Sequence, residues 1–291
     1  MIRTDGLTKR FGATVALDHL DLTVDTGEVF GFLGPNGAGK TTTIRLLLGL
    51  IRPTGGTASV LGLDPWSDVT TLHRRLAYVP GDFEVWPNLT GAETLTLLGR
   101  LHGSVDAVYQ AELVDRFDLD VSKRGRHYSK GNRQKVALVA ALATRAELLV
   151  LDEPTSGLDP LMEVTFRGCV AEAKERGQTV FLSSHILSEV EALCDRVGIL
   201  RGGRLVDEGT LEDLRHLSAR TLEVEFDGAP PDVAGIEGVD LIELSEGRLR
   251  CRIHGSPDPV VKALAHARVT SLVSREASLE DLFLSYYRDA V

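Results

Sequence analysis

A glycine-rich stretch in the first part of the chain has the residue types and the spacing needed to bind phosphate. It fits the pattern G-x-x-x-x-G-K-[ST] and consists of Gly34, Pro35, Asn36, Gly37, Ala38, Gly39, Lys40 and Thr41. In such a loop backbone N–H groups surround phosphate oxygens, and the following helix points the positive end of its dipole at them. Lys40 would reach the β- and γ-phosphates of a nucleotide, and the Thr41 hydroxyl would bind Mg²⁺. The alternative is a glycine-rich turn without a ligand; the predicted strand before the loop and the helix after it favour phosphate binding.

Two adjacent carboxylates supply the other chemistry that nucleotide hydrolysis needs. Asp152 and Glu153 follow the apolar run Leu148–Leu151, which is typical of a buried strand. Asp152 is placed to hold Mg²⁺, directly or through water, and Glu153 to orient and deprotonate the water that attacks the γ-phosphate. On its own, an acidic pair after a strand is more often a helix cap or a turn. A phosphate loop in the same domain favours the catalytic interpretation.

The elements that must position these residues follow the pattern of a parallel α/β sheet. Up to about residue 217, short β-rich runs alternate with stretches of helical periodicity. The pattern predicts strands over 28–33, 148–151 and 179–184 and helices over 41–51 and 161–176. The run Pro53–Gly56 is expected to end the first of these helices. Asp159 suits the N-cap of the second, with proline at its first position and Gly177 at its end.

Two other parts of the chain have different patterns. A largely helical insert is expected over about 90–145, opened by a capping box of Thr90 and Glu93. Beyond about residue 218, apolar and polar residues alternate over 221–226 and 248–253, which indicates strands with one buried and one exposed face. A strand near 269–274 and helices near 257–267 and 279–287 complete a small α+β appendage. The predicted domains are therefore 1–217 and 218–291.

Three further motifs identify a family. The segment Tyr128–Lys135 resembles the signature motif of ABC transporter ATPases, Ser156–Asp159 resembles their D-loop, and His185 resembles their switch histidine. With the phosphate loop and the acidic pair, they match the family in order and spacing over about residues 1–217. The resemblance implies an α/β fold with a P-loop NTPase core, an antiparallel β-subdomain that includes 2–24, and a helical subdomain formed by the insert. It also implies a head-to-tail dimer, in which ATP lies between the phosphate loop of one subunit and the signature helix of the other.

The resemblance also implies a role for each matching residue. Lys40, Glu153 and His185 are the implied catalytic residues, with His185 contacting the γ-phosphate and positioning the attacking water. Thr41 and Asp152 are the implied Mg²⁺ ligands. The remaining implied contacts with ATP come from the phosphate loop and Thr42 in the same subunit, and from Ser129, Lys130, Gly131, Asn132 and Asp159 of the opposite subunit. Ser129 suits a helix N-cap, so its hydroxyl and the N–H groups behind it would form a second anion site; a plain N-cap is the alternative.

Phe11 stands where the family places an aromatic ring against adenine. The family more often has a tyrosine there, and a base stacks on either ring. An aromatic residue in an early loop that simply fills a small core is the alternative.

Three positions depart from the motifs of the family. In the signature motif Lys130 replaces a glycine and Asn132 the usual glutamine, and Lys130 either faces the γ-phosphate or is an exposed lysine without a role. Gly81 occupies the place of a glutamine in the segment 77–84, which resembles the family's Q-loop. Either Asp82 takes over the contact of that glutamine with Mg²⁺ or the attacking water, or the contact is absent. We expect a glutamine to fit at position 81, because its space should remain.

Composition limits the class of protein. The 291 residues suit one large domain with a smaller appendage, and 32 basic against 42 acidic residues give a net charge of −10, which disfavours nucleic acid as a partner. No run approaches the roughly 20 apolar residues of a membrane-spanning helix, and Met1–Arg10 lacks the apolar core of a signal peptide. Cys169, Cys194 and Cys251 match no metal-ligand spacing and are expected to be reduced thiols in a reducing compartment.

These observations lead to one interpretation and two alternatives. The chain is predicted to be the ATP-hydrolysing subunit of an ABC transporter, using ATP and Mg²⁺ as a homo- or heterodimer at the cytoplasmic face of the membrane, beneath separate permease subunits. The segment Ser278–Phe283 resembles the tails of drug-export members, which favours export over import. A soluble ABC ATPase acting on ribosomes or DNA would carry a second ATPase domain or a long coiled coil, and neither is evident. A weak regulatory ATPase is the other alternative, which Gly81 leaves open.

Overall fold

The structure, a computed structural model, describes residues 1–216, 220–233, 235–265 and 267–275. The chain divides into two compact units, Met1–Glu208 and Gly209–Val291. The division falls earlier than the boundary after residue 217 that the change of pattern suggested, because the short helix α8 (Leu211–His216) belongs to the second unit.

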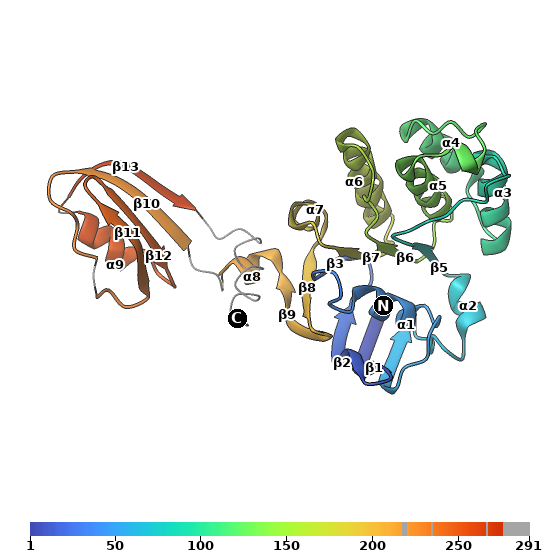
Figure 1. Cartoon of the computed structure of the whole chain (residues 1–291), viewed down its shortest axis with the longest axis horizontal. Helices are drawn as coiled ribbons and strands as arrows, with labels where there is room; N and C mark the ends of the chain where they lie inside the picture. The colour runs from blue at the N-terminus through green and yellow to red at the C-terminus, as the bar shows by residue number, and fades with distance from the viewer. Residues whose placement is uncertain (217–219, 234, 266, 276–291) are drawn as a thin grey trace. The chain divides into compact units, whose positions relative to one another are not determined.

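A six-stranded sheet forms the centre of the first unit (Figure 1). In spatial order its strands are β5 (Leu76–Val79), β6 (Leu148–Asp152), β7 (Thr179–Ser184), β3 (Val29–Leu33), β8 (Arg196–Arg201) and β9 (Arg204–Thr210). The first five are parallel. Every residue of β3, β6 and β7 is buried, as expected for strands covered on both faces. The predicted α/β class is confirmed.

Helices cover both faces of this sheet. Figure 1 shows α1 (Lys40–Leu47) on one side, and α6 (Pro160–Glu175) and α7 (Leu187–Leu193) on the other. The strands β3, β6 and β7 end at the same edge, with Leu33 opposite Ser184 and Asp152 opposite Ser183. Loops that follow parallel strands therefore meet at this edge, which is where such folds bind ligands.

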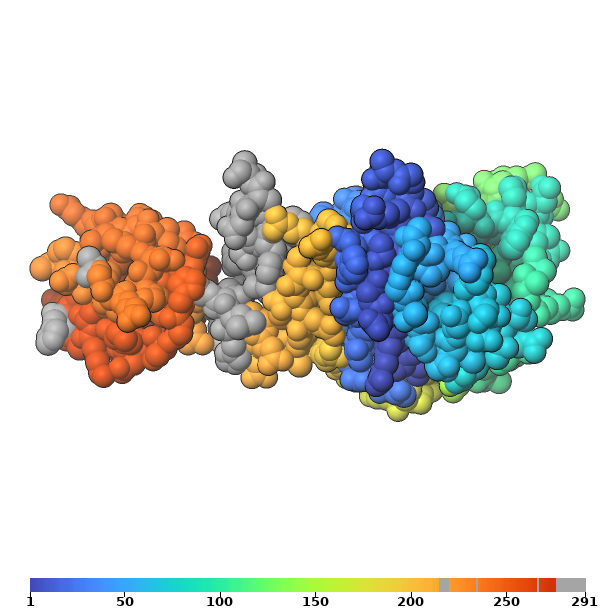
Figure 2. All heavy atoms as spheres, turned by 90° about the horizontal axis from the view of Figure 1, so that it is seen from below, coloured from blue at the N-terminus to red at the C-terminus, as the bar shows by residue number. Residues whose placement is uncertain are grey.

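A second, three-stranded sheet packs against α1. Its strands are antiparallel, in the order β2 (Thr14–Val24), β1 (Ile2–Phe11) and β4 (Gly55–Val60). Figure 2 shows the surface of β1 and β2 in dark blue beside that of β4 in lighter blue. One buried apolar cluster joins Ile2 and Leu17 of this sheet to Ile44 of α1 and Phe32 of the central sheet. The predicted antiparallel β-subdomain is confirmed.

The insert between β5 and β6 is helical, as predicted. It contains α3 (Gly91–His102), α4 (Ala107–Arg116), a 3₁₀ turn (Gly125–His127) and α5 (Lys130–Leu142), while α2 (Val69–His73) precedes β5. The capping box that opens α3 is confirmed: Thr90 Oγ1 accepts from Glu93 N at 3.2 Å, and Glu93 Oε2 accepts from Thr90 N at 2.8 Å. Both ends of the box satisfy N–H groups that the helix leaves without partners.

The predicted end of α1 and the predicted start of α6 have different outcomes. The prediction that the first helix reaches residue 51 is wrong, because α1 ends at Leu47. Gly49 has a φ of 65°, and a Cβ there would stand 2.0 Å from Pro65 O, so glycine allows the chain to turn away from the helix before the Pro53–Gly56 run. The predicted N-cap of α6 is confirmed, since Asp159 Oδ1 accepts from Met162 N at 3.0 Å.

The second unit contains a four-stranded antiparallel sheet. The strands β10 (Arg220–Asp227), β11 (Val239–Ser245), β12 (Arg248–Ile253) and β13 (Arg268–Arg275) pair in the order β11-β12-β10-β13, and α9 (Asp258–Leu264) packs on one face. The alternating residues Leu222, Val224 and Phe226 are buried, as predicted. Strand β11 was not predicted. The predicted helix over 279–287 and the segment Ser278–Phe283 lie outside the described residues.

Candidate active site

The phosphate loop joins β3 to α1 in a conformation that depends on glycine. Gly37 and Gly39 have φ values of 83° and 115°, in the left-handed region that glycine adopts without strain. A Cβ on Gly39 would also stand 2.8 Å from Ala16 O, so a larger residue would push the loop away from β2. The loop is therefore built for close approach of its backbone to a ligand.

Lys40 is folded back over this loop. Its side chain is only 5% exposed, and Nζ donates to the carbonyl oxygens of Gly34 at 2.6 Å and Pro35 at 3.2 Å. Burial lowers the pKa of Lys40, while the nearby carboxylates of Glu153 and Asp152 raise it. Two carbonyl groups are weak partners for a buried ammonium, which leaves Lys40 ready to exchange them for phosphate oxygens.

Thr41 and Asp152 bring two oxygen ligands together. Thr41 Oγ1 is 3.3 Å from Asp152 Oδ2, and the other carboxylate oxygen accepts from Ser183 Oγ. Burial raises the pKa of Asp152, and the Ser183 and Thr41 hydroxyls oppose this shift. A hydroxyl and a carboxylate are hard oxygen donors that suit Mg²⁺, which keeps its other positions for water and phosphate. Asp82 is exposed and makes no hydrogen bond or ion pair with a described residue.

Glu153 and His185 form a pair beside Lys40. Glu153 Oε1 lies 3.1 Å from His185 Nδ1 and 3.8 Å from Lys40 Nζ. The backbone of Glu153 has a φ of 48°, a conformation unusual outside glycine, and its N–H donates to Ser183 O at 3.0 Å. The structure therefore brings together five residues from three segments that are far apart in sequence: Lys40 and Thr41, Asp152 and Glu153, and His185.

The signature segment stands at the start of α5 and packs on the D-loop segment. Ser129 caps the helix by accepting from Asn132 N at 3.2 Å. Lys130 Nζ donates to Ser156 Oγ at 2.8 Å, and a Cβ on Gly131 would stand 2.4 Å from Gly157 O. No hydrogen bond or ion pair among the described residues joins this segment to Lys40, Thr41, Asp152, Glu153 and His185, here called the Lys40 cluster.

Phe11 is exposed at the end of β1. Half of its surface (51%) is accessible, and Lys9 Nζ lies 5.0 Å from the ring centroid. The alternative that Phe11 fills a small core is therefore excluded.

The space at position 81 is narrow on one side. A Cβ on Gly81 would stand 3.3 Å from Asp152 O, a tight contact that a shift of a few tenths of an ångström would relieve, and 3.8 Å from Glu153 Cβ, which is an ordinary contact. That a glutamine fits here stays a prediction. Glycine thus permits close packing of the 81–82 segment on the end of β6.

Residues that the sequence did not single out also belong to this region. Ser183 holds Asp152 through a hydrogen bond. Burial raises the pKa of Tyr78 to about 12, and the negative charge of Asp152 adds to this shift. Two serines before a predicted switch histidine were the only available signal for Ser183. Tyr78 lay within the 77–84 segment that resembles the Q-loop, and nothing in that segment distinguished it.

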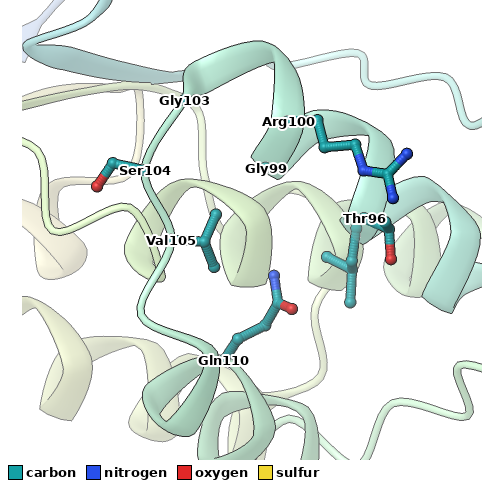
Figure 3. Close-up of a pocket in the computed structure, with 8 residues that line it drawn as sticks. Thr96, Gly99, Arg100, Gly103, Ser104, Val105 and Gln110 are labelled. Carbon is teal, nitrogen blue, oxygen red and sulfur yellow. The ribbon is translucent and has the colours of Figure 1, made fainter.

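A hollow elsewhere in the first unit is separate from the cluster. It measures about 410 Å³ and lies on the helical insert, between the end of α3 and the start of α4 (Figure 3). Its longer polar side chains are those of Arg100 and Gln110, and no carboxylate, histidine or cysteine lines it. It therefore lacks the groups needed for acid–base chemistry.

Comparison with known proteins agrees with this geometry. Residues 17–156 match a family model described as ABC transporter. Daunorubicin/doxorubicin resistance ATP-binding protein DrrA of Streptomyces peucetius is 36% identical over 98% of this chain and 91% of its own length. Bacitracin transport ATP-binding protein BcrA of Bacillus licheniformis is 38% identical over 78% of this chain and 75% of its own.

Solved structures support the same assignment. An ATP-binding subunit of an ABC transporter is 35% identical and superposes with a TM-score of 0.69, over 74% of this chain and 92% of its own. A dimeric ATP-binding cassette with bound ADP and Pi, 24% identical, shares the fold with a TM-score of 0.66 over 72% of this chain and 99% of its own. The chain belongs to the ABC transporter family as an ATP-binding subunit, and it is an ATPase.

Proposed function

We propose that the chain hydrolyses ATP at the Lys40 cluster and that this reaction drives export of a small molecule through separate membrane subunits. The observation that carries the proposal is the convergence of an ammonium, a hydroxyl and two carboxylates at the end of a phosphate loop. Lys40 Nζ and Glu153 Oε1 are 3.8 Å apart, and Thr41 Oγ1 and Asp152 Oδ2 are 3.3 Å apart.

Each side chain of the cluster has a step suited to its chemistry. Lys40 would exchange its two carbonyl partners for β- and γ-phosphate oxygens as ATP enters the loop. Glu153 would take the proton of the water that attacks the γ-phosphorus while the bond to the ADP oxygen breaks, giving ADP and phosphate. His185 presents Nδ1 to Glu153, which leaves Nε2 to contact the γ-phosphate.

Thr41 and Asp152 would hold Mg²⁺. The pair fits, because it offers a hydroxyl and a buried carboxylate, and Ser183 fixes the second carboxylate oxygen. When bound, Mg²⁺ neutralises charge on the β- and γ-phosphates. The exposed carboxylate of Asp82 is the proposed substitute for the glutamine that the family has at position 81.

We place the second half of each ATP site on another copy of the ATPase. Ser129, Gly131, Asn132 and Asp159 would face ATP from that copy. Lys130 bonds to the Ser156 hydroxyl and forms no ion pair among the described residues, so its charge is available to a γ-phosphate. The fold shared with a dimeric cassette supports this arrangement.

Phe11 gives a prediction for nucleotide binding. The exposed ring is proposed to stack on adenine, and a base–aromatic stack contributes about 1–3 kcal/mol. Phe11→Ala should therefore raise the KM for ATP about tenfold or more, with kcat nearly unchanged. Phe11→Tyr is the control and should retain the KM of the parent. Equal KM values for Phe11→Ala and the parent would remove Phe11 from the site.

The names of two relatives support the proposal that ATP hydrolysis drives export. DrrA is named for daunorubicin and doxorubicin resistance and BcrA for bacitracin transport. Among the described residues no helix has the length and apolar character to cross a membrane. From the names of these relatives we infer that the chain binds integral permease subunits at the cytoplasmic face of the membrane. No observation favours a nucleic acid or another soluble partner.

An apolar hollow offers a place for the permease to dock. It measures about 290 Å³ and lies where the helical insert meets β5, between Tyr78 and Phe83 on one side and Leu98, Leu101 and Ala137 on the other. Leu101 is 72% exposed. An apolar surface of this kind, next to Gly81, would pass movement of a docked segment to the end of β6.

A charge placed in the hollow should uncouple ATP hydrolysis by this chain from the permease. Leu101→Glu should leave hydrolysis by the isolated chain within about twofold of the parent, and should abolish stimulation by co-reconstituted permease. Val108→Glu is a matched control, because Val108 is 73% exposed on the same insert and does not line the hollow. Normal stimulation of Leu101→Glu, or equal loss in both variants, would place the docking surface elsewhere.

A further inference from the structure

A buried carboxyl group behind His185 has no part in the mechanism derived above. Glu189 lies in α7, four positions after His185, and is only 8% exposed. Its Oε2 accepts from Ser184 Oγ at 2.5 Å, and its Oε1 is buried without a hydrogen-bond partner among the described residues. Because an incompletely paired buried carboxyl costs folding free energy, an apolar side chain would fill this place better if packing were its purpose.

Glu189 acts on the segment that carries His185 through Ser184. Ser184 Oγ donates to Glu189 and accepts from the backbone N–H of Ile186 at 3.0 Å. Ser184 and Ile186 flank His185, so one hydroxyl fixes the turn from which the imidazole projects. The carboxylate sets the direction of that hydroxyl, because a hydroxyl that donates to Glu189 keeps its lone pairs for Ile186.

Glu189 also faces the segment that carries Glu153. The hydroxyl of Thr155, a residue only 7% exposed, favours the ionised form of Glu189, as Ser184 does, while burial raises the pKa of Glu189. Thr155 stands two positions after Glu153, and its carbonyl accepts from Leu158 N at 2.9 Å. The segments that carry Thr155 and Ser184 also carry Glu153 and His185, whose side chains meet at 3.1 Å.

We propose that Glu189 is a positioning residue for ATP hydrolysis, which holds the Ser184–Ile186 turn so that His185 meets Glu153. The inference rests on the proposed roles of Glu153 and His185. Among the described residues Glu189 forms no hydrogen bond or ion pair with the phosphate loop or with the Thr41–Asp152 pair, so its effect should fall on turnover and spare the binding of ATP.

Glu189→Leu separates positioning from packing. Leucine fills a similar volume, but it removes the acceptor, and the Ser184 hydroxyl then turns to Ile186 O, which is already 3.4 Å away. We expect kcat to fall about 10- to 100-fold, with an unchanged KM for MgATP and no decrease in the unfolding temperature of the full chain. Glu189→Gln keeps an oxygen acceptor and should restore kcat to within about threefold of the parent.

Two controls complete the experiment. Glu191→Gln makes the same substitution as Glu189→Gln at a part-exposed residue of the same helix, and it should leave kcat unchanged. If Glu189 acts through Ser184, the double variant Ser184→Ala, Glu189→Leu should lose no more activity than the more damaged single variant.

The inference is overturned if Glu189→Leu keeps the parent kcat, if it loses ATP binding or thermal stability in step with activity, or if the two changes are additive. Failure of the proposed function would give a different result, because Glu153→Gln would then hydrolyse ATP at the normal rate.

Discussion

Replacing Glu153 with glutamine is expected to lower the rate of ATP hydrolysis by about 10²–10⁴-fold and to leave ATP bound. Glutamine keeps the size and the hydrogen-bonding capacity of the side chain but cannot accept a proton from the attacking water. Lys40, Thr41 and Asp152 are unchanged in the variant, so the affinity for MgATP should remain. The variant should therefore accumulate as an ATP-bound dimer, which size-exclusion chromatography with ATP would detect.

A matched substitution separates loss of the base from loss of a carboxylate in general. Glu175→Gln changes an exposed glutamate at the end of α6 and should leave hydrolysis within about twofold of the parent. If Glu153→Gln also hydrolyses ATP within about twofold of the parent, Glu153 is not the general base.

The parts of the fold that the sequence predicts well are set by residues close together in the chain. The Thr90–Glu93 box and the Asp159 cap each depend on a contact across three positions, and the phosphate loop is recognised from eight consecutive residues. The core strands are recognisable because strands buried on both faces are apolar throughout. Local chemistry of this kind is visible without knowledge of the fold.

The predictions that failed depend on residues distant in the chain. The end of α1 depends on Gly49, where a Cβ would stand 2.0 Å from Pro65 O. Strand β11 escaped prediction because both of its faces are largely exposed; Leu241 and Leu244, for example, are 46% and 44% exposed. The usual sequence signal for a strand, alternation of apolar and polar residues, is interrupted by the adjacent Leu241 and Ile242, where the pairing with β12 shifts register.

Motif order located the candidate site, but not its internal contacts. The spacing of Glu153 and His185 does not reveal a positive φ at Glu153 or the hydrogen bond between the two side chains. The bond from Lys130 to Ser156 likewise joins two motifs that sequence alone treats as separate. Such contacts follow from the parallel sheet, which brings the ends of β6 and β7 together.

The central claim is that ATP is hydrolysed at sites shared between two copies of the ATPase. Dimers that combine two different variants test this claim. Lys40→Ala removes the ammonium from one half of a site, and Ser129→Arg puts a bulky cation at the start of α5 in the other half. Both sites are spoiled in a dimer of either variant alone, so each should be inactive. A dimer that contains one chain of each kind has one intact site, made of Lys40 from the first and Ser129 from the second.

The most direct test is the ATPase rate of the two variants purified alone and after mixing. With random pairing, half of the dimers are mixed and each has one of two sites intact, so the mixture should recover about a quarter of the parent rate. Differently tagged chains, purified together, provide the proof that mixed dimers have formed. No recovery in such purified mixed dimers would show that the two halves do not complement each other and would contradict the account.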